Sequence, residues 1–242
     1  MNCALDGRAL LSLWEHALAQ PPSARGDALL QAASAGEPRP RTIGERNARL
    51  ANVHARLFGS EIALLSHCPA CGTAVQFSGD CETLSMQAPS TSLMPTHRLV
   101  VDDHQIDFRL PDSADVAAAS MCDTEEDFAR ALLQRCVLAC SCGAGAIPPN
   151  QLPVSVLDAL SRRMEALDPA ACVSFDVDCP QCSTRWDARL DMAPLVWQKV
   201  QVAAEKLLLD IDSLARAYGW TESDVLALTP TRRAAYLQMA AA

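Results

Sequence analysis

Two Cys-Pro-x-Cys motifs carry the clearest chemistry in this sequence, Cys68-Pro-Ala-Cys71 and Cys179-Pro-Gln-Cys182. Two thiolates separated by two residues can occupy one edge of a tetrahedral metal site, and the amides of the turn between them stabilise the charge on sulfur. A second such turn supplies the opposite edge. The motifs therefore predict one structural zinc ion per chain, bound by Cys68, Cys71, Cys179 and Cys182.

The other cysteines leave an alternative metal site open. Cys136, Cys140 and Cys142 cluster near the middle of the chain, and Cys140-x-Cys142 could complete a site with the first motif instead. Most unassigned cysteines in proteins are small buried apolar side chains. We expect this for Cys81, Cys122 and Cys172.

A redox function is the other reading of a Cys-Pro-x-Cys motif. In thioredoxin-like oxidoreductases the first cysteine lies at the start of a helix, which lowers its pKa. Here Gly72-Thr73 and Ser183-Thr184 follow the motifs and lead into alternating, strand-like patterns. The flanking sequence therefore favours metal binding over dithiol chemistry.

No other constellation in the sequence indicates catalysis. The chain lacks a P-loop, a Gly-x-Ser-x-Gly, a Gly-x-Gly-x-x-Gly and a His-Glu-x-x-His motif. His16 and His54 lie on predicted helices and are expected at the surface, and His67 reads as a strand end rather than a ligand. We therefore predict that the protein is not an enzyme and has no small-molecule substrate.

The elements that must position the cysteines repeat along the chain. Alternating apolar residues precede and follow each motif, which predicts a strand, a tight turn and a second strand in both places. A third hairpin is predicted over Arg98–Leu110, with Asp102-Asp103 at its turn. The apolar residues that carry the first two hairpins are Ile62, Val75, Phe77, Val173, Phe175, Val177, Trp186, Ala188 and Leu190.

Helical patterns surround these hairpins. Thr42-Ile-Gly-Glu45 has the form of a capping box that begins a helix. An uncharged Gly/Pro-rich loop is expected after Val137. The fold class is thus α+β, with paired zinc-ribbon-like hairpins and a C-terminal helical subdomain. The predicted organisation is a helical segment over 1–60, the α+β core over 61–192 with a helical insertion at about 112–168, and the helical subdomain over 193–242.

Composition excludes several classes of protein. Half of the 242 residues are apolar and a fifth are charged, as in ordinary globular proteins. No segment reads as membrane-spanning, and no secretory signal is expected. The net charge of −9 argues against general nucleic-acid binding. Eleven cysteines without a signal peptide indicate a reducing compartment.

The segment from Leu207 to Leu237 reads as three helical pieces, separated near Gly219 and at Thr229-Pro230. Alone, they could form a helix-turn-helix DNA reader, so a zinc-ribbon regulator that binds nucleic acid is an alternative function. From Lys199 to Arg233 the basic and acidic residues balance, however, and the second piece begins with acidic residues, which would repel phosphates.

The stretch from Leu214 to Leu237, which contains Tyr-Gly-Trp-Thr-Glu-Ser-Asp and Thr-Arg-Arg-Ala-Ala-Tyr, resembles the C-terminal signature of a family of phage-baseplate-like proteins. These occur with contractile phage tails and related extracellular contractile injection systems. The first Cys-Pro-x-Cys hairpin, Arg109-Leu-Pro111 and Arg135-Cys-Val137 extend the resemblance to roughly residues 46–237. Ser183 departs from it by replacing the usual glycine of the second motif, and Cys140 and Cys142 are additional.

The resemblance implies a non-enzymatic structural or assembly protein of a baseplate. Its partners would be baseplate or tail proteins, met in the bacterial cytoplasm where such particles are built. Trp220 and Tyr236, with Arg232 and Arg233, are candidate partner-binding residues, since aromatic residues and arginine are enriched in interface hot spots. The alternative, which we favour for the aromatic pair, is that they pack the C-terminal helices on each other.

Overall fold

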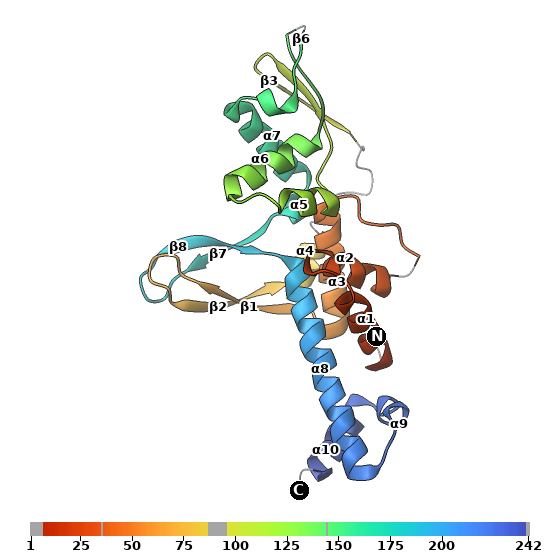
Figure 1. Cartoon of the computed structure of the whole chain (residues 1–242). Helices are drawn as coiled ribbons and strands as arrows, with labels where there is room; N and C mark the ends of the chain where they lie inside the picture. Colours follow the sequence, from red (N-terminus) through yellow and green to blue (C-terminus); the bar gives the residue numbers. More distant parts are fainter. Residues whose placement is uncertain (1–6, 35, 87–95, 144, 241–242) are drawn as a thin grey trace.

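The computed structural model describes residues 7–34, 36–86, 96–143 and 145–240. The chain has an α+β fold whose parts radiate from a central group of helices (Figure 1). A two-hairpin arm projects to one side, a mixed lobe lies above, and the C-terminal helices lie at the far end of one long helix. None of the described helices is long and apolar enough to cross a membrane.

The central helices meet the N-terminal half of the longest helix and enclose the largest apolar core. Leu29, Leu50 and Val196 are completely buried there, and the Arg25 guanidinium lies 4.6 Å from the centre of the Trp197 ring. Helical spacing of these apolar residues produces the buried stripe. The elements are α1 (Gly7–Leu18), η1 (Pro22–Ala24), α2 (Arg25–Ala33), α3 (Ile43–Phe58), α4 (Cys81–Met86) and α8 (Met192–Tyr218).

The start of α3 is held by local and distant partners. As predicted, the Thr42 hydroxyl accepts a hydrogen bond from the Glu45 amide at 3.1 Å. The Gly44 amide donates to the Asp168 carboxylate at 2.9 Å, although 124 residues separate them. Asp168 is only 1% exposed. This contact therefore ties the mixed lobe to the central helices.

Replacing Asp168 with asparagine is expected to alter the pH dependence of stability. Burial raises the pKa of Asp168. A carboxyl whose folded pKa is raised stabilises the fold fully only at low pH, and that contribution is lost as pH rises through the folded pKa. Asparagine does not titrate. The unfolding free energy of Asp168→Asn relative to wild type should thus increase as the pH rises from the ordinary carboxyl pKa of about 4 through the raised pKa of the folded state. Urea denaturation measures this difference, and a pH-independent difference would contradict the assignment.

The arm consists of two antiparallel hairpins that are distant in sequence. In β1–β2, Glu61 pairs with Asp80 and His67 with Ala74; in β7–β8, Val173 pairs with Leu190 and Asp178 with Arg185. Both hairpins extend away from the central helices, with their turns at the outer end (Figure 1). Their strands are β1 (Glu61–His67), β2 (Ala74–Asp80), β7 (Val173–Asp178) and β8 (Arg185–Leu190).

The mixed lobe contains an element that the sequence pattern did not reveal. The expected hairpin forms over His97–Val101 and His104–Phe108, but the expected loop after Val137 is instead a strand that pairs with Phe108 and its neighbours. A bulge between Asp107 and Phe108 breaks the pairing register, which obscures a two-residue alternation. The elements are β3 (His97–Val101), β4 (His104–Phe108), α5 (Ser113–Ala119), α6 (Glu125–Cys136), β5 (Val137–Cys142), β6 (Gly145–Ala146), η2 (Pro149–Gln151), α7 (Val154–Leu167) and η3 (Pro169–Ala171).

A buried carboxylate joins two segments of this lobe. Arg109 donates hydrogen bonds to both carboxylate oxygens of Asp115. The longer of the two joins Arg109 Nη2 to Asp115 Oδ1 at 2.8 Å. Arg135 reaches the same carboxylate at 3.3 Å. The Arg109 and Arg135 motifs, widely separated in sequence, thus meet in one ion-pair cluster at the join of β4, α5 and α6.

The C-terminal lobe closes on the distal half of α8. Gly219 ends that helix in the left-handed conformation, at φ 69°. Thr221 then begins the next helix with a capping box to Asp224. Leu207, Leu214 and Val225 form a small separate core with Leu11 of α1. The short helices are α9 (Glu222–Leu226) and α10 (Pro230–Ala240), and their starts agree with the sequence prediction.

Candidate metal centre

The two Cys-Pro-x-Cys turns have the same internal hydrogen bonds. The Cys68 amide donates to the Thr73 carbonyl, and the Cys179 amide donates to the Thr184 carbonyl, both at 2.9 Å. In each turn the residue after the second cysteine also donates back to the carbonyl of the first, again at 2.9 Å. This equivalence follows from the local sequence and presents both sulfurs of each turn on one side of its hairpin.

The structure brings all four predicted ligands together at the outer end of the arm. The sulfur atoms of Cys68, Cys71, Cys179 and Cys182 all lie within 4.8 Å of one another. Two pairs cross between the hairpins: Cys68 Sγ to Cys182 Sγ at 3.6 Å, and Cys71 Sγ to Cys179 Sγ at 3.5 Å. A tetrahedral ion with metal–sulfur bonds of about 2.3 Å has sulfur–sulfur edges of about 3.8 Å. The cluster thus fits a four-thiolate metal site.

The electrostatics of the cluster favour thiolates at the two exposed positions. Hydrogen bonds with the hydroxyl and with the backbone of Thr73 lower the pKa of Cys71 to about 6. Thr184 lowers the pKa of Cys182 in the same way. Burial raises the pKa of Cys179 to about 11, so this thiol requires a nearby cation to ionise at neutral pH.

Side chains between the hairpins support this convergence. The rings of Phe77 and Phe175 lie 5.5 Å apart, and the Trp186 indole donates to the Ser66 hydroxyl at 3.4 Å. Gly79 is required for the same packing, because a Cβ there would come within 2.8 Å of the Phe175 ring. The hairpins therefore contact each other along the arm as well as at the cysteines.

Ser183 adopts a backbone conformation that glycine prefers. Its φ is 57°, and the equivalent Gly72 has a φ of 74°. Non-glycine residues pay about 1 kcal/mol in this region. Ser183→Gly should therefore stabilise the arm by up to about 1 kcal/mol, and Gly72→Ala should destabilise it by a similar amount, as measured by thermal unfolding at fixed metal content. Changes of equal sign in the two variants would contradict this account.

The alternative metal site is not formed by the described residues. Cys140 is buried, and its thiol donates to the Ile147 carbonyl at 2.8 Å, whereas Cys142, two residues further along β5, is exposed at the end of the strand. Burial raises the pKa of Cys136 to about 12. In the described ranges, the one group of three or more cysteine, histidine or acidic side chains with metal-ligand spacing is the predicted quartet. Cys122 and Cys172 are exposed, contrary to the expectation that they are buried.

His54 corrects a prediction. Expected at the surface, it is 1% exposed, and its Nδ1 lies 3.3 Å from the sulfur of the buried Cys81. Burial lowers the pKa of His54 and raises that of Cys81 to about 11, so both groups are neutral at pH 7. The helical phase of Leu50, Val53 and His54 was the available signal. A catalytic cysteine needs an accessible thiolate and a base beside it. Because His54 and Cys81 are both neutral and enclosed, their contact is part of the core packing.

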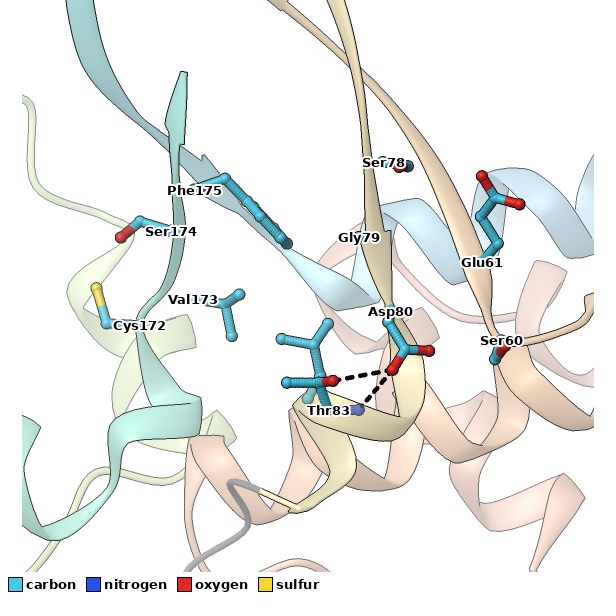
Figure 2. Close-up of a pocket in the computed structure, with 11 residues that line it drawn as sticks. Ser60, Glu61, Ser78, Gly79, Asp80, Thr83, Cys172, Val173, Ser174 and Phe175 are labelled. Carbon is cyan, nitrogen blue, oxygen red and sulfur yellow. Dashed lines mark hydrogen bonds between the residues drawn. The ribbon is translucent and has the colours of Figure 1, made fainter. Parts of the chain in front are cut away.

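A pocket at the base of the arm also lacks catalytic geometry. It has a volume of about 560 Å³ and lies between β2 and β7. Figure 2 shows Asp80 and Cys172 on opposite sides of it. Asp80 accepts hydrogen bonds from the Thr83 amide at 3.1 Å and hydroxyl at 2.9 Å, which lower the pKa of Asp80. This carboxylate thus holds the first turn of α4.

The candidate partner-binding residues lie together in the C-terminal lobe. Trp220 contacts both Tyr218 and Tyr236, with ring centres 4.8 Å apart in each case. Trp220 and Tyr236 are partly buried against the small core, which agrees with the packing alternative. Arg233 donates to Asp210 of α8 at 3.2 Å, and Arg232 is exposed.

Comparison with known proteins adds no assignment: no family model matches the chain, and neither a curated protein nor a solved structure shows significant similarity to it.

Proposed function

We propose that this protein is a non-enzymatic structural or assembly component of the baseplate of a contractile, phage-tail-like particle, and that its arm is a zinc-ribbon pair closed by one structural zinc ion. The observation that carries the structural part is the convergence of four cysteine sulfurs from two hairpins at the outer end of the arm. The baseplate part is supported by the resemblance of residues 214–237 and of the Arg109 and Arg135 motifs.

Zinc is the metal that best suits this donor set. Four cysteine sulfurs with cross-hairpin separations of 3.5 Å and 3.6 Å offer a closed tetrahedral site with no position left for a substrate or water. Closed sites of this kind are structural, whereas catalytic zinc sites keep one position open. The role of the ion would be to hold the two hairpins together at their outer end, since among the described residues no strand of one hairpin pairs with a strand of the other.

The absence of catalytic geometry among the described residues also supports a non-enzymatic role. The Cys81–His54 pair is enclosed and neutral, and the Asp80 pocket has its carboxylate committed to a helix start. The shape supports an assembly role as well, because the arm and the C-terminal lobe extend in different directions from the central helices (Figure 1). Each can reach a different neighbour in a larger complex.

Affinity purification of the tagged protein from native lysate, with and without nuclease treatment, tests the baseplate proposal. We expect sheath, tube, spike or wedge proteins to be retained, as identified by mass spectrometry. Polymerase subunits or nucleic acid, lost on nuclease treatment, would replace the proposal with the regulator alternative.

A further inference from the structure

We propose that the exposed face of α8, together with the groove between α8 and the arm, binds an acidic amphipathic helix of a partner protein. We call this surface the α8 stripe and define it by Leu195, Lys199, Val202, Lys206 and Leu209. It extends from the base of the arm toward the C-terminal lobe (Figure 1). The inference rests on the proposed function only in assuming a protein partner.

The apolar residues of the stripe are exposed on a helix surface, where polar residues are usual. Val202 is 58% exposed and Leu209 is 67% exposed. With the half-buried Leu195, they recur every seven residues, a spacing that keeps side chains close to one line along a helix. The line covers about 21 Å, or four turns, which a partner helix of similar length can match.

The groove gives this line a recessed start. It has a volume of about 660 Å³ between the arm and the first turns of α8. Leu64, Phe77 and Phe175 line it from the arm, and Leu65 adds an apolar side chain that is 66% exposed. Recessed apolar surface continuous with an exposed helical line suits a helix laid in a groove.

The lysines of the α8 stripe indicate that the partner helix is acidic. The chain has a net charge of −9 and contains two lysines, and both of them, Lys199 and Lys206, lie on the stripe. They follow Leu195 and Val202 by four residues, so they occupy one flank of the apolar line. Among the described residues, neither lysine takes part in an ion pair. Two unpaired cations beside an apolar line in an acidic protein are complementary to carboxylates on a partner.

The other charges near the stripe restrict how the partner lies. Asp191 caps α8 by accepting from the Ala193 amide at 3.1 Å, and Arg189 pairs with Glu125 at 3.0 Å. The opposite flank carries Gln198 and Glu205, and Glu205 accepts a hydrogen bond from Gln201. The carboxylates of the partner must therefore lie on the lysine flank only.

Fluorescence anisotropy with designed peptides tests this inference on the full-length protein. The probes are two helical peptides of about 18 residues with the same leucine line, one flanked by glutamates and one by lysines. We expect the acidic peptide to bind at least about tenfold more tightly at low salt. Lys199→Glu with Lys206→Glu should remove or reverse this preference, and Val202→Ser with Leu209→Ser should weaken binding of the acidic peptide by about tenfold. Glu205→Gln should tighten it.

Matched variants in the mixed lobe make the test specific. Val154 is 67% exposed and Met121 is 86% exposed, and Val154→Ser with Met121→Ser should leave peptide binding unchanged. Equal binding of both peptides, binding of neither, or an equal loss in the control variant would overturn the inference. So would sedimentation showing a dimer that Val202→Ser with Leu209→Ser dissociates, because the stripe would then bind a second copy. The assay contains no tail protein, so its failure leaves the baseplate proposal to its own test.

Discussion

Replacing Cys68 with serine is expected to remove the metal and release the outer end of the arm. Zinc content, measured by inductively coupled plasma mass spectrometry, should fall from one ion per chain to nearly none, because three thiolates leave a tetrahedral site incomplete. Structural zinc sites contribute about 10–16 kcal/mol of apparent binding energy in small domains. We therefore expect a loss of more than about 3 kcal/mol in unfolding free energy.

The part of the molecule that loses protection distinguishes loss of the metal from general misfolding. Amide hydrogen exchange should accelerate in β1, β2, β7 and β8, whereas β4 and β5, which pack around the separate core of the mixed lobe, should keep their protection. Cys179→Ser should reproduce the effect from the other hairpin. Cys142→Ser is the matched control, since Cys142 is exposed and outside the cluster. Wild-type protein that purifies without metal, or a Cys68→Ser variant that retains it, would refute the site.

Gly44→Ala is expected to have the other large effect, although it adds a single methyl group. A Cβ at this position would lie 1.6 Å from Asp168 Oδ1, which is far inside van der Waals contact. The carboxylate must therefore move, and its hydrogen bond from the Gly44 amide must lengthen or break. Overpacking together with an unsatisfied buried carboxylate should cost about 3 kcal/mol or more, as measured by urea denaturation.

Gly145→Ala is the matched control for that change. Its Cβ would have no neighbour closer than the Cys142 carbonyl oxygen at 3.7 Å, so stability should change by less than about 0.5 kcal/mol. A combined Gly44→Ala, Asp168→Ala variant should recover part of the loss, because the shorter side chain makes room for the methyl group. Equal effects of Gly44→Ala and Gly145→Ala would show that the Asp168 contact is not tight.

The sequence alone was sufficient for features whose interactions are local. The cap at Thr42, the end of α8 at Gly219 and the turns after Cys68 and Cys179 depend on partners within a few residues. Their side chains and amides are close in space in almost any arrangement of the rest of the chain. Residue type and spacing therefore predicted where these helices and hairpins begin and end.

Features that depend on distant partners were missed or left open. Strand β5 was expected to be a loop, because its alanine, serine and cysteine residues favour no strand by themselves and its pairing with β4 includes a bulge. His54 was expected at the surface, because its neighbour Cys81 comes from a different helix. In both cases tertiary packing overrode a weak local pattern.

The candidate site combines both kinds of information. Ligand type and the two-residue spacing were evident in the sequence, and they predicted which four cysteines form the site. Only the tertiary structure decided that Cys71 and Cys179, 108 residues apart, place their sulfurs 3.5 Å from each other while Cys140 and Cys142 remain in another sheet. The physical reason is that each Cys-Pro-x-Cys turn forms through its own hydrogen bonds, whereas bringing two turns together requires the packing of both hairpins against each other and the central helices.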